Sequence, residues 1–122
     1  MIKLMVIDDE AGICHFLKEF FQKRGHIVLT SQSPEEALSI LRKEKPRVIL
    51  LDILMPQISG LELLKKIREE DKDVKIIMVS IAGQDSNVQE ALRLGADAFV
   101  KKPFSVEYLE EVVMAKILEL IK

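Results

Sequence analysis

Three aspartates and one lysine of this chain follow directly after short apolar runs. Asp8 and Asp9 end the first run, Asp52 ends the third, and Lys102 follows the last. Crowded carboxylates repel each other, and a hard divalent cation held by their oxygens is the usual remedy. If these runs are neighbouring parallel strands, the four residues predict a cation site suited to phosphoryl chemistry, with the lysine as a nearby point charge.

The apolar pattern alternates between short continuous runs and longer stretches of helical period. This alternation is typical of parallel strands that helices cover on both faces. Strands are predicted at residues 3–8, 26–30, 47–52, 75–80 and 97–101.

Five helices are predicted between and after these strands. Ser33, Pro34 and Glu36 are the N-cap, first-turn proline and capping-box acid of the second helix, and Ser105 can cap the fifth. Gly25 is placed to end the first. The inward faces carry apolar residues at three- and four-residue spacing: Ile13, Leu17, Phe20 and Phe21; Ala37, Leu38 and Leu41; Leu61, Leu64 and Ile67; Val88, Ala91 and Leu92; and Val106, Leu109, Val113, Ile117 and Leu120.

Alternating strands and helices with right-handed crossovers predict a doubly wound α/β sheet. Ligands of such sheets bind at the carboxyl ends of the strands. Asp8, Asp9, Asp52, Ser80 and Lys102 all lie at or just past predicted strand ends, so we expect them on one edge.

Composition and charge narrow the class of protein. The 122 residues fit one domain, 1–122, and 18 basic against 20 acidic residues give a net charge of −2, which argues against nucleic acid as a direct partner. No apolar stretch approaches the length that spans a membrane. The lone Cys14 is compatible with a reducing compartment, and we expect a cytoplasmic protein.

Four sequence elements resemble the bacterial response-regulator receiver domain, the CheY-like family, across practically the whole chain. They are Asp8-Asp9-Glu10, Leu51-Asp52-Ile53-Leu54-Met55-Pro56 with Gly60, Ser80, and Lys102-Pro103-Phe104, in family order. The resemblance implies a flavodoxin-like five-stranded parallel sheet of order 2-1-3-4-5 with five helices.

The resemblance also implies roles for individual residues. Asp52 would be the phosphoacceptor, attacking the phosphohistidine of a sensor kinase, and Lys102 would stabilise the phosphoryl charge. Mg²⁺ would be held by Asp8, Asp9, Asp52 and the backbone carbonyl of Leu54.

Two further positions match the conformational switch of the family. Ser80 would donate its hydroxyl to a phosphoryl oxygen, and Phe99 would be the aromatic partner that remodels the face of helix four, strand five and helix five. Ile81 departs from the family, which commonly has alanine or another small residue after the switch hydroxyl. We hypothesise that Ile81 crowds the pocket and slows loss of the phosphoryl group.

Three alternatives remain beside this interpretation. A phosphohydrolase of the haloacid dehalogenase type needs a second acid two residues after the nucleophile, and Leu54 stands there. A receiver-like scaffold would bind a partner without phosphorylation, although the expected acids and lysine are all present. A nucleotide-binding enzyme is the weakest alternative, because neither a P-loop nor a GxGxxG pattern occurs.

The expected partners are a sensor histidine kinase or phosphotransfer protein and a downstream protein target. The chain ends after the fifth predicted helix. A stand-alone receiver is therefore the simplest expectation, with an excised domain of a longer protein as the alternative. A homodimer formed on phosphorylation stays open.

Overall fold

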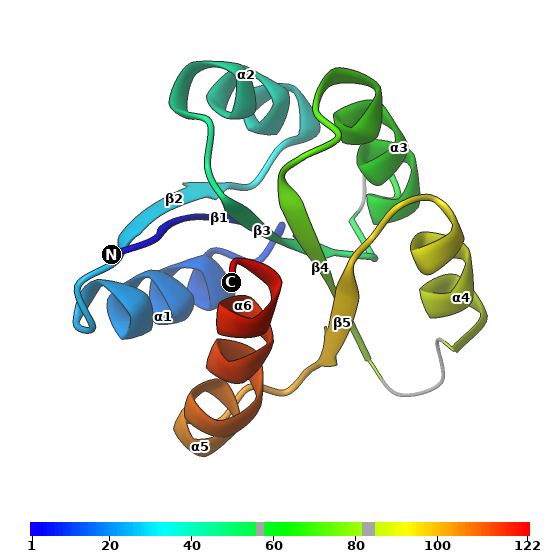
Figure 1. Ribbon diagram of the computed structural model, residues 1–122. Helices are drawn as coiled ribbons and strands as arrows, with labels where there is room; N and C mark the ends of the chain where they lie inside the picture. Colours follow the sequence, from blue (N-terminus) through cyan, green and yellow to red (C-terminus); the bar gives the residue numbers. More distant parts are fainter. Residues whose placement is uncertain (56–57, 82–84) are drawn as a thin grey trace.

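The computed structural model describes residues 1–55, 58–81 and 85–122. Pro56, part of the motif around Asp52, lies outside the described residues. Five strands form one parallel sheet of order β2-β1-β3-β4-β5 (Figure 1). They are β1 Lys3–Ile7, β2 Ile27–Ser31, β3 Val48–Asp52, β4 Lys75–Ser80 and β5 Ala98–Lys101. The predicted strands and strand order are confirmed, with ends that differ by one residue at most.

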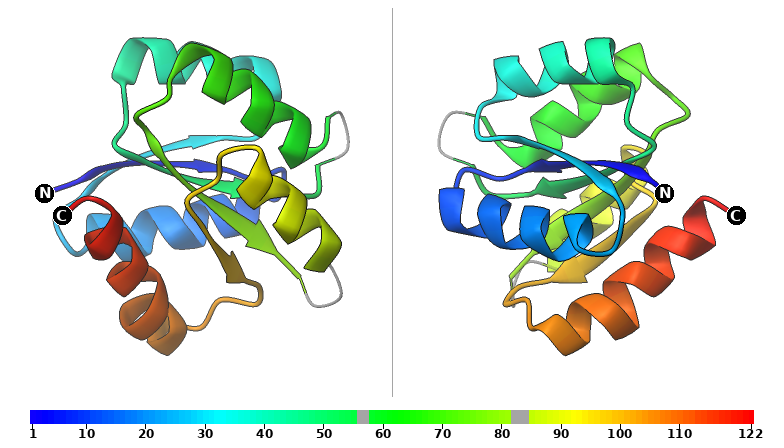
Figure 2. Two further views of the ribbon diagram at one scale, coloured as in Figure 1. Left: turned by 45° about the vertical axis from the view of Figure 1, so that its right-hand side comes forward. Right: turned by 90° about the vertical axis from the view of Figure 1, so that its left-hand side faces the viewer.

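Helices cover both faces of the sheet (Figure 2). Helices α2, α3 and α4 pack on one face, and α1 and the last helix pack on the other. Their bounds are α1 Ala11–Gln22, α2 Pro34–Glu44, α3 Gly60–Glu70 and α4 Asp85–Arg93, with the last helix made of α5 Val106–Tyr108, η1 Leu109–Val113 and α6 Met114–Leu120. This three-layered arrangement is the doubly wound fold that the apolar pattern predicts.

The central strands are buried on both faces, which explains their continuous apolar runs. In β1, Leu4 and Val6 point into the core beneath α1 and the last helix, whereas Met5 and Ile7 point toward α2 and α3. All four side chains are at most 1% exposed. Burial of this kind fixes the strand register, because a slip by one residue would exchange the two faces.

The last helix differs from the regular helix that its apolar spacing predicts. Its N-cap Ser105 accepts a hydrogen bond as expected, but Leu109–Val113 forms a π-helical turn, η1. Leu109, Val113 and Ile117 are all fully buried. Residues four apart drift around a helix of 3.6 residues per turn, and one wider turn reduces that drift. The π turn thus keeps three residues at four-residue spacing on the buried side.

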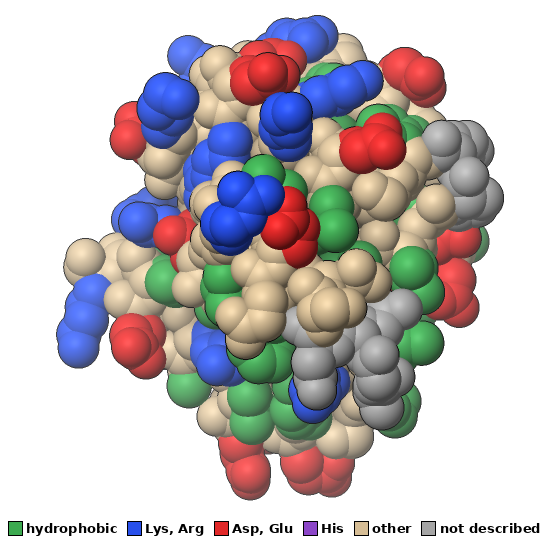
Figure 3. All heavy atoms as spheres, turned by 90° about the vertical axis from the view of Figure 1, so that its right-hand side faces the viewer, with side chains coloured by type: hydrophobic (Ala, Val, Ile, Leu, Met, Phe, Trp, Pro, Cys, Tyr) green, Lys and Arg blue, Asp and Glu red, His purple; other side chains and the backbone are tan. Residues whose placement is uncertain are grey.

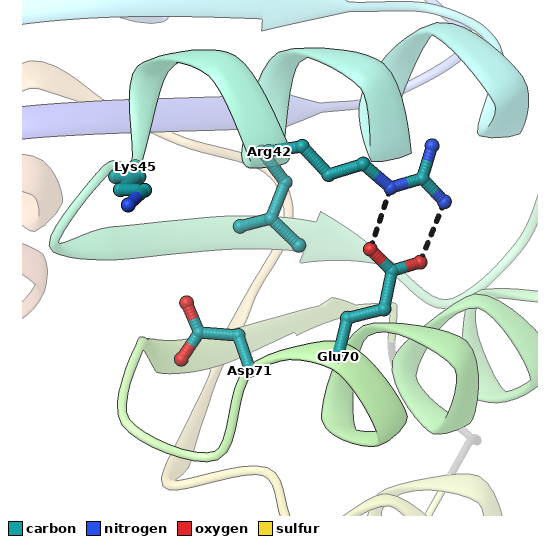
Figure 4. A pocket seen from close by; sticks show the side chains of 5 residues that line it. Arg42, Lys45, Glu70 and Asp71 are labelled. Atoms are coloured by element: carbon teal, nitrogen blue, oxygen red, sulfur yellow. Dashed lines mark hydrogen bonds and ion pairs between the residues drawn. The ribbon is translucent and has the colours of Figure 1, made fainter.

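An ion pair joins α2 and α3 at the amino ends of the strands (Figure 4). Arg42 donates two hydrogen bonds to the Glu70 carboxylate, at 2.6 and 2.7 Å. The adjoining pocket, of about 380 Å³, is also lined by Leu41, Lys45 and Asp71. It lies at the end of the sheet opposite the predicted site, so it takes no part in that chemistry.

The face over α3 and α4 carries basic and acidic side chains interspersed with each other (Figure 3). This mixture agrees with the small net charge of −2. None of the helices in the described ranges combines the length and apolar character that crossing a bilayer requires.

Gly60 begins α3 in close contact with the end of β3. A Cβ added there would lie 2.1 Å from the carbonyl oxygen of Asp52 and 2.7 Å from the Cα of Ile53. The Gly60 N–H also donates to the Ile53 carbonyl oxygen at 2.7 Å. Only glycine allows the helix to approach so near to the strand that carries Asp52.

We expect Gly60→Ala to lower the free energy of unfolding by about 2–4 kcal/mol, because backbone atoms must move to admit the methyl group. Urea denaturation measures this change. Gly12→Ala in α1 is the matched control, since nothing lies within 4 Å of its added Cβ. There we expect no loss, or a gain of about 0.5–1 kcal/mol. Equal stability of Gly60→Ala and the wild type would contradict the close contact.

Candidate functional site

The structure brings Asp8, Asp52 and Lys102 together at the carboxyl edge of the sheet. Asp8 follows β1, Asp52 ends β3 and Lys102 follows β5. The Lys102 ammonium (Nζ) lies 2.9 Å from Asp8 Oδ2 and 3.4 Å from Asp52 Oδ2. The Lys102 ammonium therefore bridges two carboxylates that are 44 positions apart in the sequence.

Short turns after β1 and β3 aim these carboxylates. Asp8 Oδ1 accepts a hydrogen bond from the Glu10 N–H at 3.0 Å, and Asp52 Oδ1 accepts one from the Leu54 N–H at 3.2 Å. In each carboxylate the other oxygen, Oδ2, faces Lys102. Because Asp8 and Asp52 are only 2% and 7% exposed, solvent screens their charges weakly.

Glu10 is a third partner of Lys102 that the sequence reasoning left without a role. Its Oε1 lies 3.0 Å from the ammonium, and its side chain is 61% exposed. Glu10 is also the N-cap residue of α1, yet its side chain makes no capping hydrogen bond. The run of three acids at a strand end was the signal that could have found it.

The oxygen ligands at this edge fit a magnesium ion. Carboxylate oxygens of Asp8, Asp9 and Glu10 lie within 4.8 Å of one another. A pocket of about 260 Å³ beside them is lined by Asp9, Glu10, Asp52, Leu54, Ile81 and Lys102. Hard oxygen ligands, several of them charged, together with room for water are what Mg²⁺ requires.

Burial and charge move the pKa values of Asp52 and Lys102. Burial, and next the charge of Asp8, raise the pKa of Asp52 from 3.8 to about 6, against the opposing effect of Lys102. Burial acts to lower the pKa of Lys102, but hydrogen bonds with Asp8 and Glu10 and the charge of Asp52 outweigh it and raise that pKa above its usual range. Lys102 therefore stays a cation, whereas burial and the charge of Asp8 disfavour the negative charge of Asp52.

Ser80 and Phe99 lie on β4 and β5 beside this cluster. Ser80 ends β4 and is 2% exposed, and its hydroxyl oxygen has no hydrogen-bond partner among the described residues. A buried hydroxyl without a partner is costly unless a ligand supplies one. Phe99 is half-buried and packs against the core beneath α2, α3 and α4. Ile81, directly after Ser80, is 46% exposed and lines the pocket.

Comparisons with known proteins agree with this fold. Residues 4–114 match the response regulator receiver domain family. Sporulation initiation phosphotransferase F of Bacillus subtilis is 32% identical over 111 residues, covering 91% of this chain and 90% of that protein. The crystal structure of the receiver domain of NtrX from Brucella abortus gives a TM-score of 0.86 at 30% identity, covering 95% of this chain and 98% of that one.

This chain belongs to the response regulator receiver domain family. It is a receiver domain of two-component signalling, a class of proteins that act as signalling phosphoacceptors. Longer relatives also match. A probable transcriptional regulator, ycf27 of Guillardia theta, is 40% identical over 113 residues, and the match covers 93% of this chain but 44% of that protein. The chain thus spans less than half the length of that curated relative.

We expect Asp52→Asn to raise the free energy of unfolding by about 1–2 kcal/mol at pH 8 without Mg²⁺, because it removes a charge that burial and the neighbouring Asp8 both disfavour. The folded-state pKa of about 6 exceeds the ordinary value of 3.8, so the folded protein binds this proton more tightly than the unfolded chain. Proton binding to Asp52 stabilises the folded state fully below about pH 4, and this stabilisation is lost as pH rises through about 6. The gain in the free energy of unfolding of Asp52→Asn over wild type should therefore be smaller at pH 5 than at pH 8.

Urea denaturation at the two pH values measures this difference. Asp73→Asn is a matched control at both pH values, since Asp73 is exposed in the loop before β4, at the amino end of that strand. A variant that is less stable than wild type at pH 8, or equally stabilised at both pH values, would contradict the raised pKa of Asp52.

Proposed function

We propose that Asp52 is the phosphoacceptor of this receiver domain and takes a phosphoryl group from the phosphohistidine of a sensor kinase or phosphotransfer protein. The observation that carries the proposal is the pairing of the Asp52 carboxylate with the Lys102 ammonium at 3.4 Å, in a pocket that Asp9 also lines. A nucleophile, a fixed cation and oxygen ligands for a metal are the parts that phosphoryl transfer needs.

In the proposed step, an Asp52 oxygen attacks the phosphorus of the donor. The new O–P bond forms as the N–P bond of phosphohistidine breaks, and the imidazole leaves with the electron pair and takes up a proton. Lys102 then balances charge that develops on the phosphoryl oxygens. Asp52 Oδ1 accepts the Leu54 N–H at 3.2 Å, and Oδ2, the oxygen that faces the Lys102 ammonium at 3.4 Å, is the proposed attacking oxygen.

Asp8, Asp9 and Asp52, with the Leu54 carbonyl, are the proposed ligands of Mg²⁺, and Glu10 is a further candidate because its oxygen joins the same cluster. When bound, Mg²⁺ supplies charge neutralisation for the carboxylates and the phosphoryl oxygens. Lys102 would give up part of its contact with Asp8 and Glu10 and turn toward the phosphoryl group.

Ser80 and Phe99 are the proposed switch residues. The hydroxyl of Ser80, which has no partner in the described part of the chain, is suited to donate to a phosphoryl oxygen, and this bond would draw the end of β4 toward Asp52. Phe99 would respond by changing its rotamer on β5. The result would be a population shift of the face formed by α4, β5 and the last helix, driven only by the contacts that differ between the two states.

The partners and setting of the signal are also part of the proposal. The donor would be a histidine kinase or a phosphotransfer protein, and the lone Cys14 is in keeping with a cytoplasmic location. The output would pass to a separate protein target, or to an output domain if the chain is part of a longer protein such as the ycf27 relatives. A homodimer that forms on phosphorylation is also part of the proposal.

Incubation with acetyl phosphate and Mg²⁺ should add one phosphoryl group, detected by mass spectrometry of the intact protein. Asp52→Asn should abolish the adduct, because an amide is not a nucleophile of this kind. Lys102→Ala should slow its formation by about tenfold or more, through loss of a charged partner in the transition state. Asp73→Asn, with its exposed acid far from the site, should react like wild type.

The same measurement separates the alternatives. Absence of any adduct in the wild type would favour a scaffold that binds without phosphorylation. Sustained hydrolysis of a generic phosphate ester would favour a phosphohydrolase, although Leu54 stands where the second acid would be needed.

Ile81→Ala should speed loss of the phosphoryl group by about two- to fivefold, which corresponds to about 0.5–1 kcal/mol of barrier. The reason is that Ile81 lines the pocket beside Asp52 and hinders the approach of water. Release of phosphate after removal of acetyl phosphate measures this rate. Leu118→Ala is the matched control, because Leu118 on α6 is an apolar residue that is 53% exposed, against 46% for Ile81. An unchanged rate in Ile81→Ala would remove the hypothesis.

A further inference from the structure

The backbone N–H of Lys101 is bound by a side chain instead of a neighbouring strand. Lys101 is paired with Ser80, and the next residue, Lys102, donates its N–H to the Ser80 carbonyl oxygen at 2.8 Å. Successive N–H groups of a parallel strand point to opposite sides. The Lys101 N–H therefore points away from β4, at the open edge of the sheet that β5 forms. There it donates to the phenol oxygen of Tyr108 at 2.9 Å.

Packing within the protein holds the phenol at this place. The Tyr108 N–H donates to the capping hydroxyl of Ser105 at 3.0 Å. The Tyr108 ring stacks on Phe104, with ring centroids 6.3 Å apart and planes inclined by 24°. Both rings pack against the core beneath α1 and the last helix. The tyrosine is thus built into the start of the last helix and reaches back to the strand end.

Tyr108 and β4 together hold the backbone on both sides of the strand end that presents Lys102. The Lys102 N–H is bound to β4, and the N–H one residue earlier is bound to Tyr108. β5 has only four residues, and short strand ends at a sheet edge open readily when their backbone groups are free.

We infer that Tyr108 is a positioning residue for Lys102, and this inference rests on the proposed function of the Asp52 site. The phenol fixes the end of β5 so that the Lys102 ammonium reaches Asp8 and Asp52 at 2.9 and 3.4 Å. Transition-state stabilisation by a point charge depends on its placement, and small displacements far from the reacting atoms cost rate. Tyr108 also ties the site to the last helix, because the same residue belongs to both.

Tyr108→Phe tests the inference, since it removes only the phenol oxygen and keeps the ring that stacks on Phe104. Hydrogen exchange of the Lys101 amide, followed by NMR, should become faster in the variant. Phosphorylation by acetyl phosphate and Mg²⁺ should slow by about three- to tenfold, as expected when one hydrogen bond that positions a reacting group is lost. Val106→Ala is the matched control: Val106 lies in the same helix start and is 45% exposed, and its truncation keeps both the phenol and the Ser105 cap. Its rate should stay within about twofold of wild type.

The decisive result is whether the slower phosphorylation of Tyr108→Phe requires Lys102. In a Lys102→Ala background, Tyr108→Phe should cause no further loss of rate, because the residue acts through the ammonium. An equal loss in both backgrounds, or a Tyr108→Phe protein that reacts like wild type, overturns the inference while the proposed function stands. Failure of the wild type to form any adduct overturns both.

Discussion

The main constraint on the site is that two carboxylates, which repel each other, are buried together at the carboxyl ends of β1 and β3. Asp8 and Asp52 are nearly inaccessible to water, and one ammonium, Lys102, bridges them. Burying like charges is costly unless they are paired, and one lysine does not neutralise three or four acids. Additional positive charge would therefore stabilise the cluster, and burial together with the charge of Asp8 raises the pKa of Asp52 to about 6. A site built in this way has the charge and the oxygen atoms that the proposed magnesium ion would need.

Packing of the sheet and helices offsets the cost of burying this cluster of charges. Apolar residues of the central strands are buried on both faces, so the strand ends occupy fixed positions. Gly60 lets α3 begin against β3, and the Asx-type hydrogen bonds of Asp8 and Asp52 direct one oxygen of each toward Lys102. Tyr108 plays the corresponding part on β5. Each contact is small, but together they hold the ends of β1, β3 and β5 where Asp8, Asp52 and Lys102 meet.

Much of this arrangement follows from local sequence patterns, and the remainder from contacts that no local pattern encodes. Apolar runs predict the strands to within one residue, and acids at strand ends predict that Asp8, Asp52 and Lys102 meet. Serine caps at Ser33 and Ser105 are confirmed for the same reason, since capping is a local interaction.

The contact of Glu10 with Lys102 joins residues 92 positions apart, and it depends on how a loop turns after β1. The bond of Tyr108 to Lys101 depends on the helix entering at one particular angle. The π turn in the last helix arises from tertiary packing of residues whose spacing alone suggests a regular helix. Ser80 shows a further limit of sequence-based prediction. Its position is evident from sequence, but only the packed structure reveals that its hydroxyl lacks a partner among the described residues.

The most direct test of the account is the titration of the Asp52 carboxyl carbon, followed by ¹³C NMR with and without Mg²⁺. Without the metal, the account predicts a midpoint near pH 6, because burial and Asp8 disfavour the charged form. Saturating Mg²⁺ should lower that midpoint clearly, since the cation stabilises the carboxylate. A midpoint near the ordinary value of 3.8 under both conditions would show that Asp52 does not share a cation-demanding pocket with the other acids.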